Sequence, residues 1–282
     1  DSNPSPADHA SPMPASAPAT PLPLSISIVC HNSEATIGRV LDSVKGLGAE
    51  IIALDSGSTD ATVDLLTRAG ATVVHQPWLG YVRQKQAALD RCAQPWVLHL
   101  DSDESLEPDL RRSIEQAIRA DDPTIAGYEL NRKIWYAGRF LHHAWQPEFR
   151  LRLVRRGRIR WGGYDPHDAM ELVPDPSAQS QRIARLPGDM RHECIASISD
   201  FLARQARHAN TAATALHARG RRGSVARLVF SPLGEFAKQI VVRRAFLDGW
   251  RGWTAASASA AATLMKHAAL IEAARASKDH GA

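Results

Sequence analysis

The sequence has few cysteines and no long hydrophobic run. Three cysteines occur in 282 residues, Cys30, Cys92 and Cys194, and their odd number and wide spacing exclude a disulfide framework or a zinc knuckle. This cysteine usage predicts a reducing, cytoplasmic setting. No run approaches the ~20 apolar residues that a membrane-spanning helix needs. The uncharged stretch from Gly252 to Met265 is short and consists mostly of small residues.

Recognisable nucleic-acid-binding motifs and internal repeats are also missing. The isoelectric point of about 9.1 alone would allow nucleic-acid binding, but the basic residues are diluted among apolar ones, which disfavours it. The first 23 residues contain seven prolines, with no basic start and no apolar stretch before Leu22, so they have neither a core-forming composition nor the layout of a secretory signal. We predict a flexible tail over 1–23, a catalytic domain over 24–195 and a helical C-terminal region over 196–282.

Short β-branched runs alternate with helical patterns up to Ala120. The expected strands are 25–30, 51–54, 71–74 and 96–100. After each strand comes a segment whose apolar residues have helical spacing, which predicts a helix there. This alternation predicts an α/β fold with a mostly parallel sheet and helices on both faces.

Polar side chains follow these strands at the edge where such sheets bind ligands. They are His31, Asn32, Asp55, Ser56 and Asp101. The most informative stretch is 98–104, in which an apolar run ends in Asp101-Ser102-Asp103. Two carboxylates there suit a divalent cation that completes its shell with phosphate and water. A simple turn is the alternative, because Asp and Ser end strands routinely.

Several segments together resemble a known family. They are Val29 to Ile37, the block Asp55-Ser56-Gly57-Ser58-Thr59-Asp60, Gly80 to Leu89, Leu100 to Glu104, Pro147 to Leu153 and Pro166-His167-Asp168. The chain resembles the inverting family 2 glycosyltransferases of the GT-A fold, and within them the lipopolysaccharide core β-1,4-glucosyltransferases. The resemblance covers residues 25–215 and implies a GT-A nucleotide-diphospho-sugar transferase domain with a UDP-sugar as donor.

The resemblance also implies roles for individual residues. Asp55 would read the uracil, Asp101 would bind the ribose or a metal, and Asp103 would coordinate Mg²⁺ or Mn²⁺. The donor-binding set is completed by His31, Asn32, Glu34, Ser56 and Lys85. Lys85 would contact a phosphate, with a solvated helix lysine as the alternative. His192 matches a histidine that would touch the metal or the diphosphate, and a structural histidine is the alternative.

Inversion by a single displacement requires one general base on the acceptor hydroxyl. Asp168 and Glu148 compete for this role. We prefer Asp168 because it follows the arginine-rich strand at 150–154 by about the interval found in related enzymes, whereas Glu148 precedes that strand. The arginines themselves, Arg150, Arg152, Arg155 and Arg156, suit an anionic acceptor, with an ordinary exposed face as the alternative.

The C-terminal region combines apolar and aromatic residues with positive charge. Between Arg221 and Arg251, seven Lys or Arg stand against two acidic residues. This composition predicts a membrane-surface element, and helices packed on the catalytic domain with basic residues facing water are the equal alternative.

Together with these observations, the resemblance implies a cytoplasmic, metal-dependent hexosyltransferase, peripheral on the inner membrane, that moves glucose from UDP-glucose onto the inner core of lipopolysaccharide. The alternatives are a hexosyltransferase for a capsule or lipid-linked glycan, and a catalytically silent nucleotide-sugar binding module.

Overall fold

The computed structural model describes residues 21–165, 167–174 and 181–279. Residues 1–20 of the expected tail lie outside the described part of the chain. Strand β1 begins at Leu22, inside the predicted tail range.

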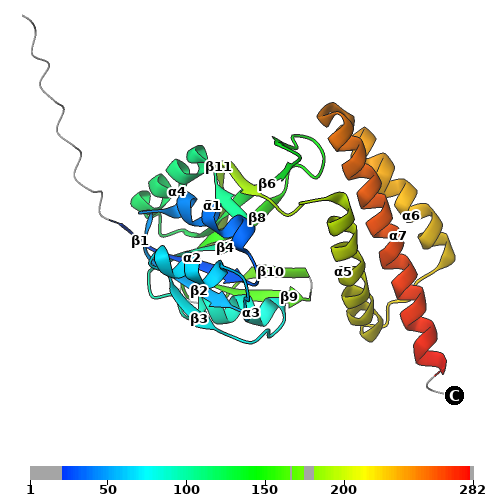
Figure 1. The fold of residues 1–282 in the computed structure, drawn as a ribbon, viewed down its shortest axis with the longest axis horizontal. Helices are drawn as coiled ribbons and strands as arrows, with labels where there is room; N and C mark the ends of the chain where they lie inside the picture. Colours follow the sequence, from blue (N-terminus) through cyan, green and yellow to red (C-terminus); the bar gives the residue numbers. More distant parts are fainter. Residues whose placement is uncertain (1–20, 166, 175–180, 280–282) are drawn as a thin grey trace, which may run out of the picture.

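Strands and helices alternate through the first half of the described chain, as the sequence predicts (Figure 1). The elements are β1 (Leu22–Cys30), α1 (Glu34–Val44), β2 (Gly48–Asp55), α2 (Thr62–Arg68), β3 (Thr72–His75), α3 (Tyr81–Leu89), β4 (Trp96–Asp101), β5 (Glu104–Leu106) and α4 (Pro108–Ala120). Strands dominate the next part, with β6 (Ile125–Tyr136), β7 (Arg139–Phe140), β8 (Phe149–Arg155), β9 (Ile159–Tyr164), β10 (His167–Leu172) and β11 (Arg182–His192).

The central sheet has the strand order β3-β2-β1-β4-β8-β6-β11-β5. Strands β3, β2, β1 and β4 are parallel, because each is joined to the next by a segment that contains a helix. Strand β8 enters antiparallel between β4 and β6, since the link from β6 to β8 contains no crossover helix. The predicted α/β fold is confirmed, and the sheet is mixed beyond β4.

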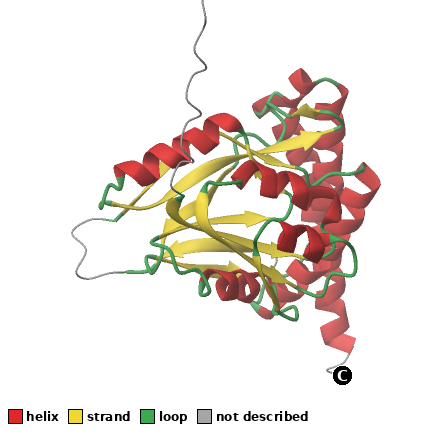
Figure 2. Cartoon of the chain, turned by 60° about the vertical axis from the view of Figure 1, so that its left-hand side comes forward, coloured by secondary structure: helices red, strands yellow, loops and turns green. Residues whose placement is uncertain are grey.

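Two hydrophobic layers cover the sheet. In β1, Leu24, Ile26 and Ile28 point to one face and are completely buried against α1, α2 and α4. Ser25 and Ser27 point to the other face, which α3 and the hairpin β9–β10 cover. This alternation is the period-two pattern of a strand, and here both faces are buried. Figure 2 shows helices on both sides of the twisted sheet.

The C-terminal region is helical, as predicted. It contains α5 (Ile198–Ala218), α6 (Val225–Ala237), a π-helical turn (Lys238–Val242), a 3₁₀ turn (Ala245–Asp248) and α7 (Trp250–Asp279). Helix α5 lies nearest the sheet, and α6 and α7 pack beyond it (Figure 1). Among the described residues, no helix is both long enough and apolar enough to span a bilayer.

The C-terminal helices are fixed to the catalytic domain by the loop that follows β7. The carboxylate of Asp248 accepts hydrogen bonds from the backbone N–H groups of His142, His143 and Ala144 at 2.8–2.9 Å. The indole N–H of Trp145 donates to Ser259 Oγ at 2.7 Å. These contacts hold the C-terminal helices beside the sheet, where they form one wall of a cleft.

Candidate active site

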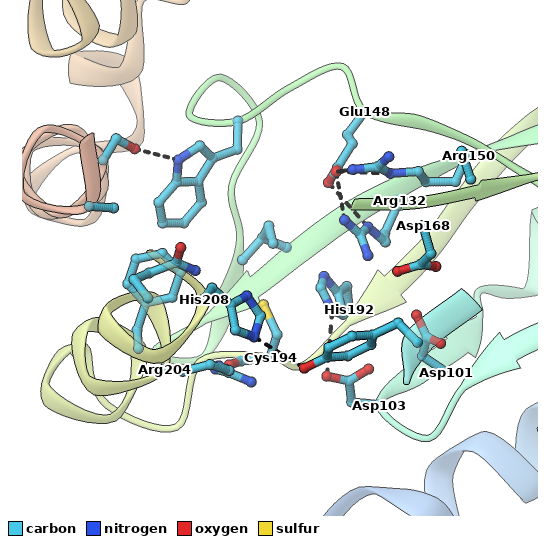
Figure 3. A pocket seen from close by; sticks show the side chains of 18 of the residues that line it. Asp101, Asp103, Arg132, Glu148, Arg150, Asp168, His192, Cys194, Arg204 and His208 are labelled. Atoms are coloured by element: carbon cyan, nitrogen blue, oxygen red, sulfur yellow. Dashed lines mark hydrogen bonds and ion pairs between the residues drawn. The ribbon is translucent and has the colours of Figure 1, made fainter. Parts of the chain in front are cut away.

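A cleft of about 1060 Å³ lies between the carboxyl ends of β1 and β4 and the C-terminal helices. Figure 3 shows charged side chains of the sheet directed into it, with α5 on the opposite side. The residues lining its sheet side include His31, Ser56, Lys85, Asp101, Asp103, Arg132, Glu148, Arg152, Asp168 and His192. Most of the predicted site residues therefore share one cleft.

Strand register explains this convergence. Strand β1 lies between β2 and β4, and Cys30 is paired with Asp55 while Val29 is paired with Asp101. The three strands are parallel, so the polar residues at their carboxyl ends meet at one edge of the sheet.

Asp55 organises the loop that follows β2. Its carboxylate accepts hydrogen bonds from the backbone N–H groups of Gly57 at 2.9 Å and Ser58 at 3.0 Å. Burial alone would raise the pKa of Asp55, but the hydrogen bonds from Ser58 and Gly57 hold it below its usual value. Asp55 is buried and is not among the described residues that line the cleft.

Asn32 and Glu34 hold the same loop from the side of β1. Asn32 has a left-handed backbone, with φ of 49°, and its Oδ1 accepts from the Thr59 N–H at 2.8 Å. Glu34 Oε2 accepts from the Ala61 N–H at 3.0 Å. These two residues shape the loop, whereas His31 and Ser56, also predicted to bind the donor, reach the cleft itself.

Asp101 lies between two cations. Its Oδ1 is 2.8 Å from Lys85 Nζ, and its Oδ2 is 2.8 Å from Arg152 Nη2. Burial by itself would raise the pKa of Asp101, but Lys85 and Arg152 hold it well below its usual value. Lys85 is therefore a buried, ion-paired lysine and not the solvated residue of the alternative interpretation.

Lys85 also reaches the predicted base. Its Nζ lies 2.9 Å from Asp168 Oδ2, and 4.9 Å from the ring centroid of Trp161. Asp168 stands on β10, opposite Gly163 of β9. Pro166, the first residue of the predicted Pro166-His167-Asp168 motif, lies outside the described residues.

Glu148, the alternative base, is held by two arginines. Its Oε1 is 2.6 Å from Arg132 Nη2 and 2.7 Å from Arg150 Nη2. Burial opposes ionisation of Glu148, but the two guanidinium groups lower its pKa to about 2. A carboxylate with so low a pKa is a weak proton acceptor.

The charges of this cluster balance. Four carboxylates and four cations face one another: Asp101, Glu104, Glu148 and Asp168, and Lys85, Arg132, Arg150 and Arg152. Asp103 is outside this set, with its Oδ2 3.4 Å from His192 Nε2. Burial would raise the pKa of Asp103, but His192 lowers it.

The residues that could hold a divalent cation are Asp103 and His192. Both line the cleft, the Asp103 side chain is 26% exposed, and His192 Nδ1 is buried without a hydrogen-bond partner. No group of three acidic, His or Cys side chains in the described chain is arranged to hold a metal, and Asp101 faces Lys85 and Arg152 instead. Two protein ligands suit a cation whose remaining ligands are substrate oxygens and water.

The arginines predicted to meet the acceptor have other partners. Arg152 is buried, and its Nη2 lies 2.7 Å from Glu104 Oε1 in addition to its contact with Asp101. Arg155 Nη2 lies 2.8 Å from Asp121, and its guanidinium stacks on the Trp96 ring. Arg152 still lines the cleft, whereas Arg155 is not among the described residues that do, so the acceptor role of the arginines stays a prediction.

Sequence reasoning missed two sets of cleft residues. Arg132 lines the cleft and pairs with Glu104, which is completely buried beneath it. Glu104 belongs to the Leu100 to Glu104 segment that resembles the family, but no role is assigned to it, and Arg132 has no signal beyond its place in an expected strand. The second set comes from the C-terminal helices and includes Arg204, His208, Lys238 and Arg243. Helical spacing identifies these helices but does not show that they return to the cleft.

The geometry can be compared with known proteins. The family model described as Glycosyl transferase family 2 matches residues 25–171. The lipopolysaccharide core biosynthesis glycosyltransferase LpsC of Rhizobium meliloti is 32% identical over 75% of this chain and 78% of that protein. An uncharacterized glycosyltransferase, RT0209, of Rickettsia typhi is 30% identical over 88% of this chain and 87% of that protein.

Among solved structures, glucosyl-3-phosphoglycerate synthase from Mycobacterium tuberculosis, in complex with Mn²⁺, uridine-diphosphate and glucosyl-3-phosphoglycerate, is 21% identical. It covers 71% of this chain and 81% of its own, with a TM-score of 0.44. TarS of S. aureus is 16% identical, covering 66% of this chain and 39% of its own, with a TM-score of 0.42.

Proposed function

Because this chain belongs to glycosyl transferase family 2 and has the GT-A type of α/β fold, we propose that it is an inverting hexosyltransferase. Its donor is UDP-glucose and its acceptor the inner core of lipopolysaccharide, on the cytoplasmic side of the inner membrane. The likeness to LpsC, named for lipopolysaccharide core biosynthesis, supports this acceptor. The observation that carries the proposal is the convergence of Asp101, Asp103 and Asp168 in one cleft.

The donor lies at the carboxyl ends of β1, β2 and β4 in this proposal. The loop held by Asp55, Asn32 and Glu34 forms one border, and His31 and Ser56 present polar groups toward the cleft. Asp55 acts here through the shape of the loop, since its carboxylate already accepts two backbone N–H groups.

A divalent cation, Mg²⁺ or Mn²⁺, would be held by Asp103 and His192. When bound, it would neutralise the charge that develops on the leaving nucleoside diphosphate. Asp101 does not take part as a ligand in this arrangement. Its carboxylate fixes Lys85 and Arg152, which place positive charge beside the same region of the cleft.

Asp168 is the proposed general base. Its carboxylate takes the proton of the acceptor hydroxyl while the acceptor oxygen bonds to the anomeric carbon, and the bond from that carbon to the diphosphate oxygen breaks with its electron pair. A single displacement of this kind inverts the anomeric centre. Asp168 has one cationic partner, Lys85, whereas Glu148 has two, and this difference supports Asp168 over Glu148.

UDP release by the purified full chain tests the proposal. We expect release from UDP-glucose to require Mn²⁺ or Mg²⁺, to stop with a chelator, and to rise when core oligosaccharide is added. Capsular or lipid-linked acceptors in place of core oligosaccharide test the alternative hexosyltransferase function. Binding of UDP-glucose without release for any acceptor would favour the silent binding module and overturn the proposed activity.

A further inference from the structure

The C-terminal helices carry most of the exposed apolar surface of the described chain. Of fourteen exposed large apolar side chains, ten lie between Val225 and Trp253, and their exposed fractions run from 45% for Phe246 to 76% for Val242. The ten are Val225, Val229, Phe230, Leu233, Val241, Val242, Phe246, Leu247, Trp250 and Trp253, and we call them the apolar face. Ten exposed large apolar side chains within 29 residues of the chain mark this region as a candidate interaction site.

The apolar face is one side of an amphipathic segment. In α6, Val225, Val229, Phe230 and Leu233 follow one another at spacings of four, one and three residues, which places them on one side of the helix. Glu235, at another angle of the same helix, lines the cleft, and so does Gln239 in the π-helical turn. The same segment thus contributes to the cleft wall and to the outer surface.

The charges around the apolar face have one sign. Four basic residues of this region are exposed and are not among the described residues that line the active-site cleft: Arg221, Arg222, Arg227 and Arg244. Both acidic residues of the stretch are engaged by neighbouring groups. Asp248 accepts the three backbone N–H groups of 142–144, and Glu235 contacts Gln239 Nε2 at 2.8 Å and Lys238 Nζ at 3.3 Å.

We propose that the apolar face docks on an anionic phospholipid bilayer, with the helices lying in the plane of the interface. Apolar side chains would enter the boundary between head groups and acyl chains, Trp250 and Trp253 would sit at head-group level, and the basic residues would meet lipid phosphates. A second copy of the chain fits the face less well, because a symmetric contact would bring the same basic residues together.

Docking would also orient the cleft. Asp248 and the link from Trp145 to Ser259 join the C-terminal helices to the catalytic domain, so a bilayer bound to the apolar face lies beside the cleft wall formed by the same helices. An acceptor anchored in that bilayer would reach the cleft without leaving the membrane. This consequence rests on the proposed function, whereas the docking itself does not.

Vesicle flotation of the full chain tests the docking. We expect the protein to float with vesicles of phosphatidylcholine and phosphatidylglycerol, to float little with phosphatidylcholine alone, and to lose binding at high salt. The double variant Phe230→Ser/Leu233→Ser should lower the partition coefficient about tenfold or more. Arg222→Gln/Arg227→Gln should lower it on the order of tenfold on the anionic vesicles. The matched control is Ile183→Ser, an exposed apolar residue of β11 that is 39% exposed.

Several outcomes would overturn the docking. Equal flotation of the wild type and Phe230→Ser/Leu233→Ser, with both shown to be folded by circular dichroism and thermal unfolding, contradicts it. A wild type that sediments as a dimer without vesicles, with a monomeric double variant, assigns the face to a second copy. Flotation without any UDP release would keep the docking and remove the proposed function.

Discussion

The ammonium group of Lys85 lies between the carboxylates of Asp101 and Asp168, 2.8 Å from one and 2.9 Å from the other. The lysine comes from α3, Asp101 ends β4, and Asp168 stands on β10. One buried side chain therefore fixes the position of the proposed general base relative to the donor-binding edge of the sheet.

Replacing Lys85 should reduce turnover by more than a loss of folding stability would explain. We expect Lys85→Met to lower kcat about 100-fold, because the two carboxylates lose the cation that holds them in position. Lys133→Met is the matched control. Lys133 also contacts a carboxylate, Asp189 at 2.9 Å, but it is not among the described residues that line the cleft. UDP release and thermal unfolding of both variants check this prediction, and equal losses of kcat would contradict it.

The two candidate bases should respond differently to amide substitution. We expect Asp168→Asn to lower kcat by about 10²–10⁴, with UDP-glucose binding retained, since the amide still accepts a hydrogen bond from Lys85 but takes no proton. Glu148→Gln should leave most of kcat. Isothermal calorimetry measures UDP-glucose binding and UDP release measures turnover, so the two assays together show which carboxylate acts as the base. A larger loss of kcat in Glu148→Gln would transfer the role of base to that residue.

The sequence predicts the first half of the fold well because its signals are local. Runs of β-branched residues, helical spacing and Pro108 at the start of α4 determine elements that the structure contains. The arrangement of β5, β9, β10 and β11 was not predicted. Their strands are short or rich in arginine and acidic residues, and their pairing depends on contacts between residues far apart in the chain.

The sequence predicts which residues belong to the candidate site, but not which side chains they pair with. Spacing and family resemblance identify Asp101, Asp103 and Asp168 as cleft residues. They do not reveal that Arg152 pairs with Asp101 and Glu104, because those contacts join β8 to the end of β4 and the start of β5, about 50 residues away in the chain. The direction of a strand side chain is set by register, which a sequence pattern determines only where one face is polar.

The ion pairs of Glu148 should make stability depend on acidic pH. Both folded and unfolded chains carry the charged carboxylate well above pH 4.5, so the contribution is complete there. As the pH falls from 4.5, the unfolded chain binds the proton first, and the contribution is lost by about pH 2.

Unfolding by denaturant across this pH range measures the contribution of Glu148. We expect Glu148→Gln to lose on the order of 2 kcal/mol at neutral pH and progressively less below pH 4.5. The control Glu129→Gln removes a more exposed pair with Arg185 and should change stability by about 0–1 kcal/mol. A difference between wild type and Glu148→Gln that stays constant from neutral pH to pH 2 would contradict the assignment.

Thiol labelling should distinguish the three cysteines. Burial, with Asp55 nearby, raises the pKa of Cys30 to about 12, and burial raises that of Cys92 to about 11. Cys194 is partly exposed and lines the cleft. Because the thiolate is the reactive form, a maleimide should modify Cys194 first in the native protein and all three after unfolding. Intact-mass spectrometry counts the adducts.

Modification of Cys194 should also block the cleft. UDP release should fall in step with the first adduct, while Cys194→Ser should keep its activity through the same treatment. First labelling at Cys30 or Cys92, or an adduct without loss of activity, would show that the cleft is arranged differently.

The close approach of β11 to the start of α4 depends on a glycine. Gly188 has φ of 97°, and an added Cβ would lie 2.4 Å from the backbone nitrogen of Leu110, a completely buried residue. Gly188→Ala therefore combines a left-handed backbone with a clash against main-chain atoms that cannot turn aside. We expect it to lower the free energy of unfolding by about 2–4 kcal/mol.

Gly38 supplies the matched control for this substitution. It lies inside α1 with no heavy atom within 4 Å of an added Cβ, so Gly38→Ala should raise the free energy of unfolding by about 0.5–1 kcal/mol. Denaturant unfolding of both variants measures the two effects. Opposite signs are expected because only one of the two glycines is required by its surroundings. If Gly188→Ala were as stable as the wild type, the start of α4 would not pack against β11 as closely as the structure shows.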